Sequence, residues 1–248
     1  VRSAAAIGIA EVLIDAGLRP DVVVGCSSGA IFGATVALDL TAEEALRLAT
    51  SLWSQELTQQ RRWRAYAQLV APRWTGFDAG FSLRSDKLIV QRLAQAFGPL
   101  RLEEFTATPL RVTATEAATG RAVTLTRGPL VRAIQASIAV PLLFPSVEVD
   151  GRRLVDGVVS DPLPVGAARD ADVVVALGFR GAMPRRVDRA ARLVAQASTA
   201  LINNLYDARL EAAGAGAGRC AGAGAADRAL SRCAGARLRG PLGRHATG

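Results

Sequence analysis

The pentapeptide at residues 25–29, Gly-Cys-Ser-Ser-Gly, holds the side chains best suited to chemistry, because its spacing is G-x-S-x-G. A short β-branched run precedes it and a helix-forming stretch follows. The pattern therefore predicts Ser27 as a nucleophile on a sharp strand-to-helix turn, with Gly25 and Gly29 leaving room beside it. The N–H of Ser28 would be one donor to an oxyanion. An ordinary glycine-rich turn or a phosphate-binding loop is the alternative interpretation.

A serine nucleophile needs a base, and the sequence offers few. The only histidine, His245, lies in a low-complexity tail, and Lys87 is the only lysine. Among the carboxylates, Asp156 ends the predicted strand Arg153-Leu154-Val155 and precedes Gly157, so we expect it to project from a strand end onto a tight turn. Asp161 is close enough in sequence to be a rival base, but it precedes a proline, and a turn residue is the simpler account.

Composition excludes several classes of protein. The chain has 248 residues and a net charge of +8, of which residues 212–248 carry +5. The rest is therefore not notably basic, and we expect no nucleic-acid partner. Three cysteines cannot form a disulfide framework for this length, and Cys26 is interpreted as a small buried filler. With neither a signal peptide nor a spanning segment expected, the sequence predicts a cytoplasmic protein.

Alternating strands and helices predict an α/β fold. Thr41 and Glu44 form a capping box, and Asp150-Gly151 is a strong hairpin signal. Val173–Leu177 is predicted as a buried strand. Helices are expected over residues 4–16, 30–38, 41–53, 88–97, 129–137 and 187–210, and strands over 22–24, 110–115, 121–126, 146–149, 152–155 and 172–178.

Three separated stretches resemble the signatures of the patatin-like phospholipases. They are residues 25–30 (Gly-Cys-Ser-Ser-Gly-Ala), residues 133–145 (Ala-Ile-Gln-Ala-Ser-Ile-Ala-Val-Pro-Leu-Leu-Phe-Pro), and residues 156–165, which begin Asp-Gly. The resemblance implies a three-layer α/β/α sandwich with a mainly parallel sheet. It also implies a Ser27–Asp156 dyad that hydrolyses lipid acyl esters without metal or cofactor, with contact to a membrane surface possible.

The family also carries a glycine-rich oxyanion loop after its first strand. Here the chain opens at Val1-Arg2-Ser3, so Arg2 falls where the family has its arginine, while the glycines and the first strand are lacking. The expected division is a hydrolase domain over residues 1–211 and an Ala/Gly/Arg-rich, disordered tail over 212–248.

Two further hypotheses remain open. One is a catalytically incompetent remnant that only binds lipid or a protein partner, and the other is a polyanion-binding module that uses the arginines of the tail. The aromatic and arginine-rich segment Trp53–Phe81 is interpreted either as a lid that touches a membrane or as a helical excursion packed in the core.

Overall fold

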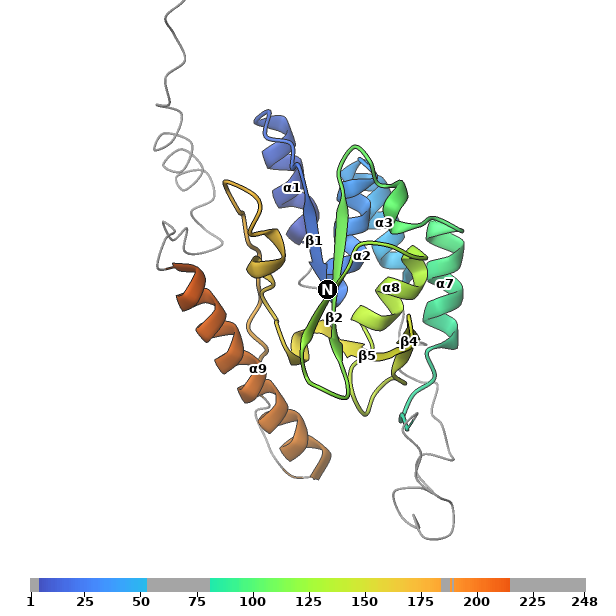
Figure 1. The fold of residues 1–248 in the computed structure, drawn as a ribbon, viewed down its shortest axis with the longest axis vertical. Coiled ribbons are helices and arrows are strands. Elements are labelled where there is room, and N and C mark those ends of the chain that lie inside the picture. Colours follow the sequence, from blue (N-terminus) through green and yellow to red (C-terminus); the bar gives the residue numbers. More distant parts are fainter. Residues whose placement is uncertain (1–4, 53–80, 184–187, 189, 215–248) are drawn as a thin grey trace, which may run out of the picture. The chain divides into compact units, whose positions relative to one another are not determined.

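A computed structural model describes residues 5–52, 81–183, 188 and 190–214 (Figure 1). The chain divides into two compact units, one ending at Arg209 and the other beginning at Leu210. The expectations for Arg2, His245 and the Arg-rich tail from residue 215 onward lie outside the described residues. So does that for Trp53–Phe81, apart from Phe81, which is buried.

Strand β2 (Leu110–Glu116) organises the sheet, because it pairs with three other strands. β1 (Val23–Cys26) runs parallel to it, whereas β3 (Ala122–Leu125) and β5 (Arg152–Asp156) run antiparallel. β4 (Val147–Val149) pairs antiparallel with β5. The expected α/β class, with helices against a central sheet, is confirmed; among the described strands, one pair is parallel and three are antiparallel, so this part of the sheet is mixed.

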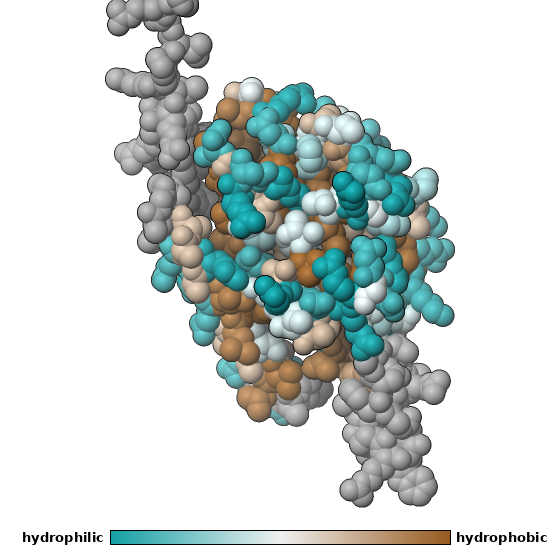
Figure 2. Space-filling view, viewed as in Figure 1, coloured by the Kyte–Doolittle hydropathy of each residue, from teal (hydrophilic) through white to brown (hydrophobic). Residues whose placement is uncertain are grey.

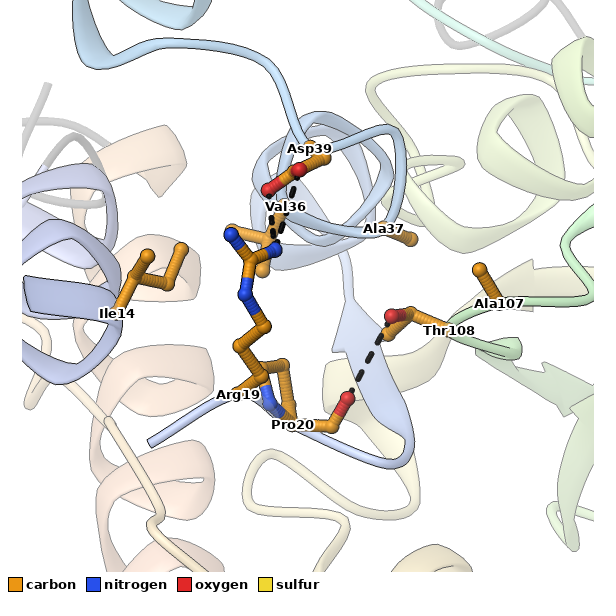
Figure 3. Close-up of a pocket in the computed structure, with 8 residues that line it drawn as sticks. All are labelled: Ile14, Arg19, Pro20, Val36, Ala37, Asp39, Ala107 and Thr108. Carbon is orange, nitrogen blue, oxygen red and sulfur yellow. Dashed lines mark hydrogen bonds and ion pairs between the residues drawn. The ribbon is translucent and has the colours of Figure 1, made fainter. Parts of the chain in front are cut away.

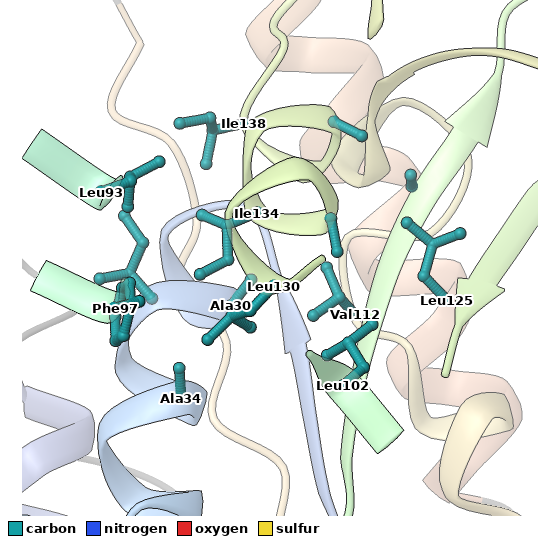
Figure 4. Close-up of a cluster of buried hydrophobic side chains, with 14 of the residues drawn as sticks. Ala30, Ala34, Leu93, Phe97, Leu102, Val112, Leu125, Leu130, Ile134 and Ile138 are labelled. Carbon is teal, nitrogen blue, oxygen red and sulfur yellow. The ribbon is translucent and has the colours of Figure 1, made fainter. Parts of the chain in front are cut away.

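Helices cover the face of the sheet that buries its apolar side chains. α2 (Ser28–Ala37) packs on β1 and β2, and α8 (Leu130–Ser137) packs on β2, β4 and β5. α7 (Lys87–Phe97) packs behind α8, and α3 (Ala42–Leu52) contacts α2 and α7. Figure 4 shows the resulting core, in which side chains from α2, α7, α8 and the strands meet. Its fully buried members include Ala30, Leu93, Val112, Leu130 and Ile134.

Two local signals fold as the sequence predicts. The main-chain N–H of Thr41 donates to Glu44 Oε2 over 2.9 Å and the N–H of Glu44 donates back to Thr41 Oγ1 over 3.3 Å, so the capping box starts α3. Asp150 and Gly151 both have positive φ, 49° and 71°, which joins β4 and β5 through a tight hairpin. Both features need only neighbouring residues.

The prediction of a buried strand over residues 172–178 is wrong. The segment has no strand pairing, and Val173 and Val175 are 67% and 65% exposed. A β-branched run becomes a buried strand only where a neighbouring strand accepts its hydrogen bonds and a helix covers it. None of the described strands pairs with this run, so its apolar side chains lie at the surface.

The long helix α9 (Ala190–Gly214) also carries exposed apolar side chains, among them Leu193 and Leu201. Figure 2 shows apolar side chains at the surface over the first part of this helix. The remaining helix, α1 (Ala5–Asp15), packs on α2 and α3 through Ile7. Within the residues that are described, no helix has both the length and the apolar character needed to cross a bilayer.

Candidate active site

The turn between β1 and α2 has the strained geometry of a nucleophile elbow. Ser27 has a positive φ of 54° with ψ of −127°, a backbone conformation that residues other than glycine rarely adopt. A Cβ at Gly25 would lie 2.4 Å from Ala30 Cα, so only glycine lets the helix fold back so closely on the strand. The turn therefore holds Ser27 rigidly at the end of β1.

The steric reason that we gave for Gly29 does not hold. A Cβ at Gly29, in the first turn of α2, would meet no atom of the described residues within 4 Å. Crowding therefore requires glycine at the first position of the motif but not at the last. Ser28 begins α2 directly after the nucleophile, as its predicted part in the oxyanion hole requires.

The register of the sheet brings the two predicted catalytic residues together. On β2, Thr113 pairs with Cys26 of β1, and the next residue, Ala114, pairs with Asp156 of β5. The other edge of β2 is occupied by β3 at both positions, so β1 and β5 share one edge. Because β1 is parallel to β2 and β5 is antiparallel, the carboxyl ends of both strands meet there.

At this meeting point the Ser27 hydroxyl donates a hydrogen bond to Asp156. The Oγ–Oδ2 distance is 2.8 Å, although the two residues are 129 positions apart in the sequence. The other carboxylate oxygen, Oδ1, accepts the main-chain N–H of Val158 over 3.0 Å. A nucleophile and a carboxylate within hydrogen-bond reach form the arrangement that serine activation needs.

Burial raises the pKa of the Asp156 carboxylate. Asp156 has no exposed surface, and loss of solvation raises its pKa from 3.8 to about 7, although its hydrogen bonds with Val158 and Ser27 oppose the shift. A carboxylate with this pKa is a far stronger base than an ordinary aspartate at neutral pH. The environment thus supplies the basicity that the residue type alone lacks.

Gly157 lets the main chain pass close to the nucleophile's strand. A Cβ at this position would lie 2.8 Å from the Thr113 carbonyl oxygen and 2.9 Å from Cys26 Sγ. Any larger residue would push Asp156 away from β1 and β2. The glycine after the base therefore has a packing role like that of Gly25 before the nucleophile.

Two other reactive groups, Cys26 and Asp161, lie close to Ser27 and Asp156. Burial and the nearby Asp156 raise the pKa of the Cys26 thiol to about 12, and its Sγ points to the Asp161 carbonyl oxygen at 3.6 Å. The Asp161 carboxylate lies 3.4 Å from Nε of Arg209. Cys26 is half-buried rather than fully buried, but it stays protonated and acts as packing.

Sequence reasoning missed two hydroxyl groups that support the site. Ser137, the last residue of α8, accepts the main-chain N–H of Ser27 over 2.8 Å. Thr115 on β2 donates to the Asp156 carbonyl oxygen over 2.9 Å. Both side chains are buried. A polar residue at the end of an apolar helix face was a usable signal for Ser137, whereas nothing local marked Thr115.

A small pocket elsewhere in the molecule is not the site. Figure 3 shows that Ile14, Arg19, Pro20, Asp39 and Thr108 line it with three small or apolar neighbours, at the end of β1 opposite to Ser27. Arg19 is engaged in a two-oxygen contact with Asp39 at 3.0 and 3.1 Å. Apart from the paired Arg19 and Asp39, the described residues that line this pocket carry no charge, and none of them is a serine or cysteine. Among the described residues, no group of three or more acidic, cysteine or histidine side chains could hold a metal ion.

These features define an α/β protein with a serine nucleophile elbow and a buried aspartate as its partner. A family model for patatin-like phospholipases matches residues 1–169, and the chain belongs to this family. Three uncharacterized NTE family proteins, one from Mycobacterium bovis and two from Mycobacterium tuberculosis strains, are each 34% identical to it over 182 residues. The alignment covers 73% of this chain and 46% of each relative, so the chain spans about half their length.

Proposed function

We propose that this chain is a serine acyl hydrolase that cleaves acyl esters of phospholipids or lysophospholipids through Ser27 and Asp156. The hydrogen bond of 2.8 Å between Ser27 Oγ and a fully buried carboxylate carries the proposal. Membership of the patatin-like phospholipase family supports a lipid ester as the substrate. The finer assignments, the dyad and the lipid class, are our inference.

The reaction follows from the geometry in two steps. Asp156, ionised above its raised pKa of about 7, accepts the Ser27 proton as Oγ attacks the ester carbonyl, and the alcohol leaves with that proton. Water then attacks the acyl-enzyme and gives a proton to the same carboxylate. Asp156 passes this proton to Oγ as the fatty acid leaves, which restores both the Ser27 hydroxyl and the ionised base. We assign the oxyanion to the start of α2, where the main chain of Ser28 and the positive end of the helix dipole stabilise negative charge.

The test is covalent labelling by a fluorophosphonate probe together with hydrolysis of a short-chain p-nitrophenyl ester. Ser27→Ala should abolish labelling, and Asp156→Ala should lower turnover by at least about 10³-fold. Ser51→Ala and Asp170→Asn, which change an exposed serine and an exposed aspartate, should leave both signals unchanged. A folded parent chain that neither reacts with the probe nor cleaves the ester would contradict the proposal and favour a remnant that only binds lipid.

A further inference from the structure

Ser137 lies where the pairing between β1 and β2 ends. The last residue pair of the parallel ladder is Cys26 with Thr113, and beyond it the chain turns into the elbow. The Ser137 hydroxyl occupies this position: it accepts the N–H of Ser27 over 2.8 Å and donates to the Thr113 carbonyl oxygen over 2.7 Å. One buried hydroxyl thus joins the nucleophile's main chain to the central strand.

The same end of α8 also contacts the base. Two residues after Ser137, the Ala139 carbonyl oxygen accepts the main-chain N–H of Asp156 over 2.9 Å. The short segment from Ser137 to Ala139 therefore hydrogen-bonds to both members of the dyad. It lies between two strand ends that are also joined directly by the hydrogen bond between the Ser27 and Asp156 side chains.

We infer that Ser137 is a positioning residue, which holds the Ser27 main chain so that Oγ points at Asp156. The inference rests on the proposed function. Ser27 is fixed at two points, its N–H by Ser137 and its hydroxyl by Asp156, and its positive φ persists only while such contacts determine it. Without the hydroxyl, the part-buried N–H of Ser27 and the Thr113 carbonyl oxygen lose their partner, and the elbow relaxes toward an ordinary conformation.

The first experiment compares Ser137→Ala with Thr35→Val by probe labelling and thermal unfolding. Thr35 is a matched control, because its buried hydroxyl donates only within α2, to the Phe32 carbonyl oxygen over 2.7 Å. We expect Ser137→Ala to slow Ser27 labelling and lower kcat by about 10- to 100-fold with KM nearly unchanged. Thr35→Val should lower the unfolding temperature without this loss. Equal labelling rates in both variants would overturn the inference.

A second experiment separates positioning from general loss of structure. If Ser137 acts through the dyad, adding Ser137→Ala to Asp156→Ala should reduce the residual rate much less than it does in the parent chain. Independent, multiplicative losses would count against a role in positioning. Ser137→Thr, which keeps the hydroxyl, should recover most of the activity if the added methyl is accommodated.

The amide of Ser27 gives a measurement that needs neither a variant nor activity. In the unaltered chain, its hydrogen exchange, followed by NMR, should be as slow as that of buried amides in α2. Fast exchange would overturn the inference even in an active enzyme. A parent chain without any labelling but with a protected Ser27 amide would instead refute the proposed hydrolysis and leave the positioning contact standing.

Discussion

The residues at the two strand ends that form the site, Ser27 and Asp156, each cost the fold stability, but for different physical reasons. At the end of β1, Ser27 has a backbone conformation with φ of 54°, which costs on the order of 1–3 kcal/mol. At the end of β5, Asp156 has an ordinary φ of −49°, but its carboxylate is fully buried and its pKa is raised to about 7. The proposed nucleophile is strained in its main chain, whereas the ionised form of the proposed base is destabilised by lost solvation.

The difference follows from what each group must do. A nucleophile needs a fixed direction of approach, which a rigid main chain supplies. A carboxylate base needs a high proton affinity, which burial supplies. A glycine lies beside each residue, Gly25 before the turn and Gly157 after the base, because main chains approach too closely for a Cβ at both positions.

Substituting Gly25 by alanine should have the largest effect. The new Cβ would lie 2.4 Å from Ala30 Cα and 2.7 Å from the Gly29 carbonyl oxygen, both main-chain atoms that cannot move without opening the elbow. We expect the free energy of unfolding to fall by about 3 kcal/mol or more and Ser27 labelling to disappear. Urea unfolding and the probe measure the two losses. A stable, active Gly25→Ala variant would show that the close approach of α2 to the end of β1 is not needed.

The pH dependence of acylation should report the base. Because burial raises the pKa of Asp156 to about 7, its ionised form is lost as the pH falls below that value. We expect kcat/KM for a neutral ester to fall about 50-fold between pH 7 and pH 5, with a slope of about tenfold per pH unit below pH 6, and to level off above pH 8. A midpoint near 4 would mean that the folded site keeps Asp156 solvated.

Replacing Asp156 by asparagine should stabilise the fold at neutral and higher pH while it abolishes turnover. The unfolded chain releases the Asp156 proton near pH 3.8 and the folded chain near 7, so the parent loses stability as the pH rises between these values. Asparagine removes that loss. We expect a gain on the order of 2 kcal/mol at pH 8, since some of the benefit is offset where the Val158 N–H loses a charged acceptor.

Asp170→Asn is the control for this experiment, because its effect on folding stability should have the opposite sign. A hydrogen bond from Arg111 lowers the pKa of Asp170 to about 2, so its ionised form stabilises the fold above the unfolded value of 3.8. This substitution should lower stability slightly at pH 8, and its effect should shrink as the pH falls from about 4 through 2. Urea unfolding of both variants across this range measures the two trends. Parallel trends in the two variants would contradict the contrast between buried and exposed carboxylates.

Gly29→Ala should have the smallest effect, and a favourable one. The position lies in α2, and no atom of the described residues lies within 4 Å of an added Cβ. Alanine is the better helix former, by up to about 1 kcal/mol, so the unfolding temperature should rise slightly. A loss of stability comparable to that of Gly25→Ala would show that the last glycine of the motif is also required by packing.

Local patterns in the sequence determined much of this protein. The elbow motif, the capping box at Thr41 and the Asp150-Gly151 hairpin are encoded by neighbouring residues, because turns and helix starts depend on contacts a few positions apart. The residues next to Ser27 and next to Asp156 likewise marked each of them as a strand-end residue with suitable chemistry. Their partnership was reached by elimination of other bases and by resemblance to a family.

Only the tertiary structure decided how these parts meet. The register on β2 places the ends of β1 and β5 at the adjacent residues Thr113 and Ala114, and no local pattern encodes a pairing across 129 positions. It also decided that Val173–Leu177 stays exposed, because a β-forming run needs a strand beside it. Ser137 gained its importance in the same way: its hydroxyl reaches the nucleophile only once α8 packs on the sheet.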